Sequence, residues 1–135
     1  MAFDVSATSS GRSAVFGPVA SSAGAARRFL RAELDQLHVG EPPAEATVLL
    51  TNELISNAVL HARTDMELRV RTEDDVLRVE VHDGNSRRPT PAPTPADATS
   101  GRGLQLVESL ADRWGVEGTP DGKVVWFELP FARIG

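Results

Sequence analysis

The chain has 135 residues and a formal net charge of −5 at pH 7, which suits one acidic globular domain. This charge argues against general binding to nucleic acid or to an anionic membrane. No apolar run approaches the roughly 18 residues of a transmembrane helix. The first residues lack the basic and apolar regions of a secretory signal, and the absence of cysteine fits a reducing compartment. We therefore expect a cytoplasmic protein with a flexible tail over residues 1–12 and one domain over residues 13–130.

The first half of the chain predicts a strand, two helices and a hairpin, in that order. A strand is expected over residues 13–19, followed by a helix capped by Ser21 or Ser22 that runs to about Leu37. The prolines at 42–43 open a second helix, which extends to about Ala62. Apolar and polar residues then alternate over 66–71 and 77–82 around a polar turn, which is typical of two paired strands.

The second half begins with a long segment that has no hydrophobic periodicity. Residues 86–100 are rich in proline and small polar residues, so they form either a functional loop or a disordered insertion. A helix is expected from about residue 101 to 113, then strands over 114–117 and 124–129. This order predicts a two-layer α/β (α+β) sandwich, in which three helices cover one face of a mixed, mostly antiparallel sheet.

Two sets of polar residues lie at positions that the patterns predict to be buried. Glu53, Asn57 and His61 recur at intervals of four residues, so they form one stripe along an otherwise apolar helix. Asp83 continues the inward register of the strand over 77–82. Each group costs free energy unless it has a partner. The stripe therefore either bonds another part of the protein or faces a ligand.

A nucleotide needs the kinds of groups that this chain offers. A carboxylate accepts the exocyclic N–H of a purine, and a glycine-flanked helix start presents free backbone amides to phosphates. A carboxamide oxygen suits Mg²⁺. A second carboxylate near the γ-phosphate accepts the proton of an attacking hydroxyl.

The segment E-L-I-S-N-A-V-L-H over residues 53–61 resembles the N box, E-x-x-x-N-A, of the GHKL superfamily of ATP-binding domains, which includes gyrase, sensor histidine kinases and MutL. The resemblance covers nearly the whole chain and is closest to stand-alone anti-sigma-factor serine-protein kinases and related bacterial regulatory ATP-binding proteins. It implies that Glu53 is the catalytic general base, that Asn57 is the Mg²⁺ ligand and that Asp83 reads the adenine amine. It also implies an ATP lid at about 84–100. The remaining nucleotide-binding positions by this resemblance are Asn85, Gly101, Arg102, Gly103 and Leu104.

Arginines on the first helix are open to two interpretations. The simpler one is a solvated helix face formed by Arg27, Arg28 and Arg31. By the resemblance, Arg27 is the best match for an arginine that contacts phosphates or a partner, with Arg28 as its competitor.

Two departures from the family pattern lie at the adenine end. The glycines of D-x-G-x-G are shifted or lost in Asp83-Gly84-Asn85-Ser86-Arg87, and Gly122 is followed by Lys123 in place of a threonine. They leave three interpretations open. The first is an anti-sigma factor and serine/threonine-protein kinase that uses Mg²⁺ and ATP to phosphorylate a STAS-type anti-anti-sigma protein. The second is a non-catalytic, ATP-dependent partner-switching module, and the third is a scaffold whose polar residues satisfy one another.

The resemblance also implies partners. A sigma factor and an anti-anti-sigma (STAS) protein are expected, with no nucleic acid and no membrane. A homodimer is a further interpretation, because relatives form one and because outward-facing Trp126 and Val124 would make an apolar patch.

Overall fold

The computed structural model describes residues 5–8, 11–85 and 110–132. Its helical elements are α1 (Ser21–Gln36), α2 (Pro43–Asn57) and the π-helical turn η1 (Ala58–Ala62). Its strands are β1 (Val5–Thr8), β2 (Gly11–Phe16), β3 (Met66–Glu73), β4 (Val76–Asp83), β5 (Arg113–Thr119) and β6 (Gly122–Pro130).

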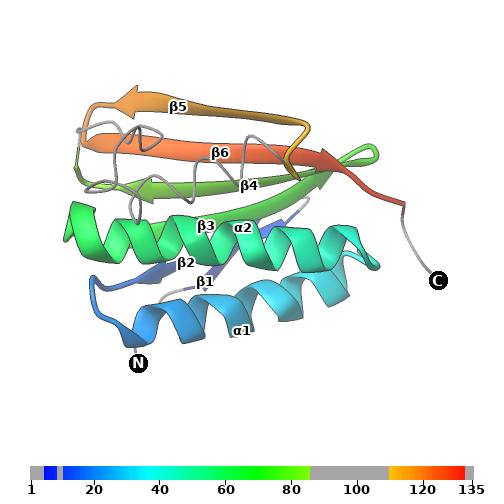
Figure 1. Cartoon of the computed structure of the whole chain (residues 1–135), viewed down its shortest axis with the longest axis horizontal. Helices are drawn as coiled ribbons and strands as arrows, with labels where there is room; N and C mark the ends of the chain where they lie inside the picture. Colours follow the sequence, from blue (N-terminus) through cyan, green and yellow to red (C-terminus); the bar gives the residue numbers. More distant parts are fainter. Residues whose placement is uncertain (1–4, 9–10, 86–109, 133–135) are drawn as a thin grey trace.

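The strands form one sheet in the order β1-β2-β3-β4-β6-β5. Helices α1 and α2 lie side by side across one face of it, which gives the two-layer α+β sandwich that the sequence predicts (Figure 1). Every neighbouring pair of described strands is antiparallel, so the expectation of a mixed sheet is wrong for this part of the chain. The expected third helix lies almost entirely outside the described residues.

The core lies between the helices and the sheet, and the alternation of apolar residues places it there. The inward side chains of the three central strands are almost fully buried, as predicted. On β4 and β6, which pair although about 40 residues separate them in sequence, the inward residues lie directly opposite one another. These opposed pairs are Leu77–Leu129, Val79–Phe127 and Val81–Val125.

Three local predictions were wrong. Segments of the expected tail over residues 1–12 form β1 and the start of β2, because two short strands extend the sheet edge by backbone pairing that side-chain patterns do not reveal. Neither Ser21 nor Ser22 caps α1. The Ser22 hydroxyl instead donates to the Gly17 carbonyl at 2.6 Å, which fastens the connection between β2 and α1. The strand expected from residue 114 begins one residue earlier, at Arg113.

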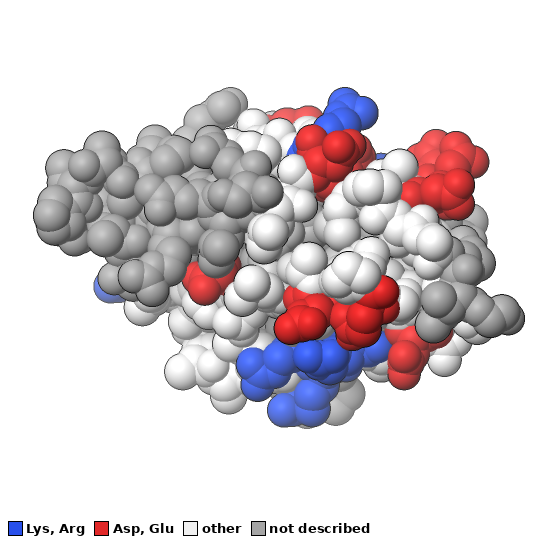
Figure 2. All heavy atoms as spheres, turned by 45° about the vertical axis from the view of Figure 1, so that its right-hand side comes forward, with Lys and Arg blue, Asp and Glu red and all other residues white. Residues whose placement is uncertain are grey.

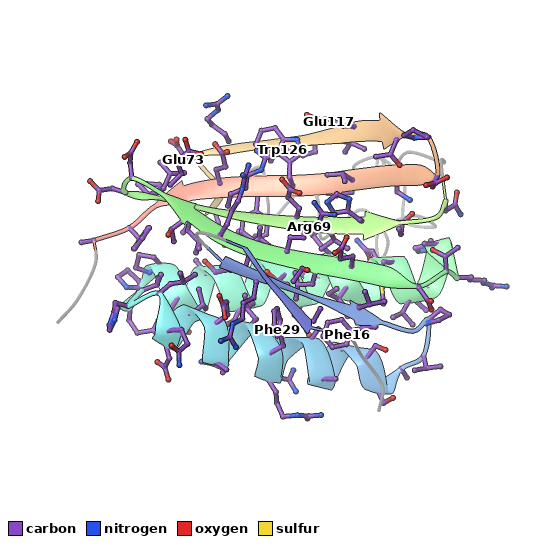
Figure 3. All side chains as sticks on the ribbon, turned by 180° about the vertical axis from the view of Figure 1, so that it is seen from behind. Phe16, Phe29, Arg69, Glu73, Glu117 and Trp126 are labelled. Atoms are coloured by element: carbon purple, nitrogen blue, oxygen red, sulfur yellow. The ribbon has the colours of Figure 1, made fainter. Side chains whose placement is uncertain are left out.

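The sheet face opposite the helices carries a charged network, not the apolar patch expected for dimer formation. Val124 is buried, and Arg78 stacks over the Trp126 ring with its Cζ 4.2 Å from the ring centroid. Arg78 also donates to Glu80 at 2.6 Å and to Glu128 at 2.9 Å. Figure 3 looks onto this side of the sheet, with Trp126 labelled on β6. The apolar argument for a homodimer at Trp126 and Val124 is therefore not supported by this face.

Candidate nucleotide-binding site

Glu53 and Asn57 lie one helical turn apart near the end of α2. The neighbouring face of α2 buries Leu50, Leu54 and Ile55 against the core, and the half-buried Glu53 and Asn57 lie at the margin of that face. The Glu53 side chain makes no hydrogen bond or ion pair with any described residue. Its carboxylate is thus held in place by the helix and is available to a ligand.

The polar stripe does not continue as a regular α-helix to His61. After Asn57 the chain widens into the π-helical turn η1, and Arg63 ends it in the left-handed conformation, with φ 57°. The His61 side chain is exposed. Its backbone carbonyl, 3.3 Å from Asn85 Nδ2, accepts a hydrogen bond. The end of the helix is thereby joined to the segment that follows β4.

Asp83 is the inward carboxylate that the strand register predicts. Its side chain is only 3% exposed, although its backbone lies partly at the surface. Asp83 Oδ1 accepts a hydrogen bond from the Asn85 backbone N–H at 2.8 Å and lies 3.1 Å from Lys123 Nζ. Sequence reasoning identified the buried acid but missed its cationic partner.

Lys123 reaches Asp83 because β4 and β6 place the two residues directly opposite each other. The Lys123 side chain is 9% exposed, and its ammonium also donates to the Asn85 carbonyl at 3.0 Å. Burial of two charges costs free energy that their attraction offsets only with good geometry and additional hydrogen bonds. The contacts of Asn85 with both partners supply such bonds.

The backbone around Asp83 is fixed by two further close contacts. The Thr64 hydroxyl accepts a hydrogen bond from the Gly84 N–H at 2.8 Å. At Gly122, an added Cβ would lie 1.9 Å from the Asp83 carbonyl oxygen, so only glycine allows the two strands to approach here. Gly122 therefore has a structural role, and Thr64 is a contributor that the sequence analysis did not single out.

Not all of the predicted site residues can be placed. Gly101, Arg102, Gly103 and Leu104 lie outside the described residues, as does the expected lid beyond Asn85. Arg27 and Arg28 are both exposed on α1, and neither makes an ion pair with a described residue.

Figure 2 shows the distribution of charge on one face of the described residues. In the view of Figure 2, acidic side chains occur in several clusters and basic ones gather mainly along the lower edge. This distribution fits the net charge of −5.

Metal ligands are sparse in the described part of the chain. Residues 5–8, 11–85 and 110–132 contain no cluster of three or more His, Cys, Asp or Glu side chains able to hold a metal. A Mg²⁺ ion bound largely by phosphates and water needs only one or two protein oxygens. The Asn57 side-chain oxygen suits that limited role.

Comparison with models of known protein families identifies the family of this chain. The model of the histidine kinase-like ATPase domain matches residues 19–129, which is most of the chain. The protein therefore belongs to the histidine kinase-like ATPase domain family, and the GHKL expectation is confirmed at that level. A search of curated proteins finds no match. Among the described residues, no helix is long and apolar enough to cross a membrane.

Proposed function

We propose that this chain is an ATP-binding regulatory protein that transfers the γ-phosphoryl group of ATP to a serine of a protein partner. The observation that carries this proposal is the placement of Glu53. It is a half-buried carboxylate without a partner among the described residues, one helical turn from Asn57. Its position matches the glutamate of the E-x-x-x-N-A motif, where the resemblance implies the general base.

Each predicted site residue has a separate role in this proposal. Asp83 accepts the exocyclic amine of adenine at the buried end of the site. Asn57 supplies an oxygen ligand to a Mg²⁺ ion that accompanies the phosphates. Arg27, exposed on α1, contacts either the phosphates or the protein partner. By the resemblance, Asn85 and residues 101–104 would complete the nucleotide contacts, and residues 84–100 would form the ATP lid.

The reaction needs one proton acceptor and correct positioning of two oxygens. The partner's serine oxygen forms a bond to the γ-phosphorus, and the bond from that phosphorus to the leaving oxygen of ADP breaks. The serine hydroxyl proton passes to the Glu53 carboxylate. Glu53 is suited to this step because no described residue holds its carboxylate in an ion pair.

The proposed partners follow from the resemblance of the N box to stand-alone anti-sigma-factor kinases. In one state the protein would bind a sigma factor in the cytoplasm, and in the other it would phosphorylate a STAS-type anti-anti-sigma protein. A homodimer belongs to the same proposal. Its interface is left open, because Val124 is buried and Trp126 is covered by Arg78.

A second candidate is a non-catalytic module in which nucleotide binding switches partners without transfer. The observation that favours it is the departure from the family pattern at the adenine end, where Lys123 replaces a threonine and forms an ion pair with Asp83. This pair also gives partial support to a scaffold that binds no nucleotide. Glu53 has no such internal partner among the described residues, which favours a ligand-binding role.

Phosphoryl transfer with γ-labelled ATP tests the proposal. The purified protein is incubated with Mg²⁺, γ-labelled ATP and each STAS-domain protein of the source organism, and labelled serine is quantified. We expect label on one STAS protein and at least a ~100-fold lower rate for Glu53→Gln, in line with loss of a general base. Glu45→Gln, which alters an exposed carboxylate on the same helix, should retain the rate.

The outcomes separate the candidate functions. Undiminished transfer by Glu53→Gln would refute the role of Glu53 as base. ATP binding without transfer to any STAS protein would favour the non-catalytic module. No ATP binding by the wild-type protein would leave only the scaffold.

A further inference from the structure

Lys123 is an unusual residue in this chain. Of the 14 lysine and arginine residues it is the only lysine, and it is nearly buried. At an exposed surface position, lysine and arginine would serve equally well as a cation. A compact ammonium with three N–H donors fits a confined site where the planar fork of arginine is too large.

The position of Lys123 is set by the sheet, not by a flexible loop. It follows Gly122 at the start of β6 and continues the inward row of Val125, Phe127 and Leu129. Asp83 ends the corresponding inward row of β4. Asp83 and Lys123 therefore lie at one end of the apolar core. Asn85, which contacts both, also contacts the His61 carbonyl.

The ion pair leaves one donor and one acceptor side by side. Two of the three Lys123 N–H groups are directed at Asp83 Oδ1 and the Asn85 carbonyl, and no other described residue accepts from the third. On the acid, both described hydrogen bonds end on Oδ1, and none from a described residue ends on Oδ2. Among the described residues, the pair therefore leaves one N–H donor of Lys123 and the Oδ2 acceptor of Asp83 without a partner.

This arrangement is complementary to the Watson–Crick edge of adenine. That edge carries the N6 amine, which donates, next to the ring nitrogen N1, which accepts. Asp83 Oδ2 matches the amine, and the third N–H of Lys123 matches N1. A charged donor makes a stronger hydrogen bond than a neutral hydroxyl or water would.

We propose that Lys123 is a specificity-determining residue that donates directly to N1 of the adenine ring, an inference that rests on the proposed ATP site. The lysine does not block the base-reading aspartate. Asp83 would bind the N6 amine and Lys123 would bind N1 of the same adenine. The Asn85 backbone carbonyl accepts a hydrogen bond from Lys123 and holds it in position.

The inference is tested with ATP, 1-deaza-ATP and GTP by calorimetric titration of the wild-type protein. In 1-deaza-ATP a C–H group replaces N1, so the base keeps its amine and its shape but loses the acceptor. We expect 1-deaza-ATP to bind about 10- to 100-fold more weakly than ATP, as loss of a hydrogen bond to a charged group implies. GTP should also bind more weakly than ATP, because guanine carries an N–H at N1.

Variants and a spectroscopic signal make the assignment specific to Lys123. In Lys123→Met, ATP and 1-deaza-ATP should bind within about twofold of each other, since no charged donor distinguishes them. Arg71→Met, which removes an exposed cation from β3, should keep the wild-type preference. Because the chain has one lysine, labelling of lysine Nζ with ¹⁵N yields one side-chain ammonium signal, and ATP should shift it more than 1-deaza-ATP does.

The results have distinct meanings. Equal wild-type binding of ATP and 1-deaza-ATP would overturn the role of Lys123 and leave the proposed ATP site intact. Tighter binding of GTP than of ATP would overturn the adenine assignment. Absence of binding by any of the three nucleotides would overturn the proposed site and this inference together. The wild-type comparison decides the matter even if Lys123→Met does not fold.

Discussion

The ion pair between Asp83 and Lys123 should contribute to folding as a coupled unit, which a double-mutant cycle can measure. The variants are Asp83→Leu, Lys123→Met and the two combined. Each single change leaves one buried charge without its counterion, and removal of one partner from a buried pair costs about 3–5 kcal/mol. We expect about 3 kcal/mol for each, because Asn85 still donates to Asp83 Oδ1 and still accepts from Lys123 Nζ.

The double variant distinguishes coupling from general damage. It contains no unpaired charge, so it should lose well below the sum of the single losses, with a coupling energy of about 2–3 kcal/mol. The assay is urea unfolding at pH 7, with the free energy of unfolding taken at constant m-value. A more exposed pair at a comparable distance, Arg69 to Glu67 at 2.8 Å, is the control and should couple by less than about 1 kcal/mol.

If the losses in free energy of unfolding were additive in the Asp83 and Lys123 cycle, the reasoning would be refuted, because the two charges would not interact. A coupling energy no larger than that of the exposed pair would refute it as well. Both outcomes would also remove the geometric basis for a shared role of these residues in reading a base.

Two further predictions concern Thr51 on α2 and Glu80 on β4. Thr51 and Thr47 are both buried on α2, but only the Thr47 hydroxyl has a hydrogen bond, at 2.7 Å to the Pro43 carbonyl. Thr51→Val should therefore raise the free energy of unfolding by about 1 kcal/mol and Thr47→Val should lower it, and a loss in both would contradict this. The hydrogen bond from His82, followed by that from Arg78, lowers the pKa of Glu80 from 4.5 to about 2. The stabilisation by Glu80 is therefore present above pH 4.5 and is lost as the pH falls toward 2, so Glu80→Gln should cost about 1–2 kcal/mol at pH 7 and almost nothing near pH 2 in chemical unfolding. A cost independent of pH would contradict this linkage.

The sequence predicted the elements whose signals are local. The hairpin of β3 and β4 follows from strict alternation around a polar turn, and its inward register correctly places Asp83 on the core side. The extent of the second helix is correct as well, since α2 and η1 together span Pro43–Ala62. In both cases the periodicity of apolar residues is enough to define the buried face.

The missed features depend on contacts between distant segments. Lys123 meets Asp83 only because β6 pairs with β4, and nothing local in the sequence specifies that register. Strand β1 was missed because backbone pairing at a sheet edge needs no apolar alternation. The widening of the helix after Asn57 leaves the spacing of the N-box residues unchanged, so the spacing predicts the stripe but not its geometry.

Calorimetric titration with Mg-ATP tests the central claim, that this chain binds ATP between the end of α2 and the ends of β4 and β6. We predict saturable binding by the wild-type protein. Asp83→Asn, with its fold verified by circular dichroism, should bind about 10- to 100-fold more weakly, as expected for loss of a hydrogen bond to a charged group. Asn57→Ala should weaken Mg-ATP more than ATP without metal. No binding of Mg-ATP by the wild-type protein up to millimolar concentrations, or unchanged affinity in both variants, would contradict the claim.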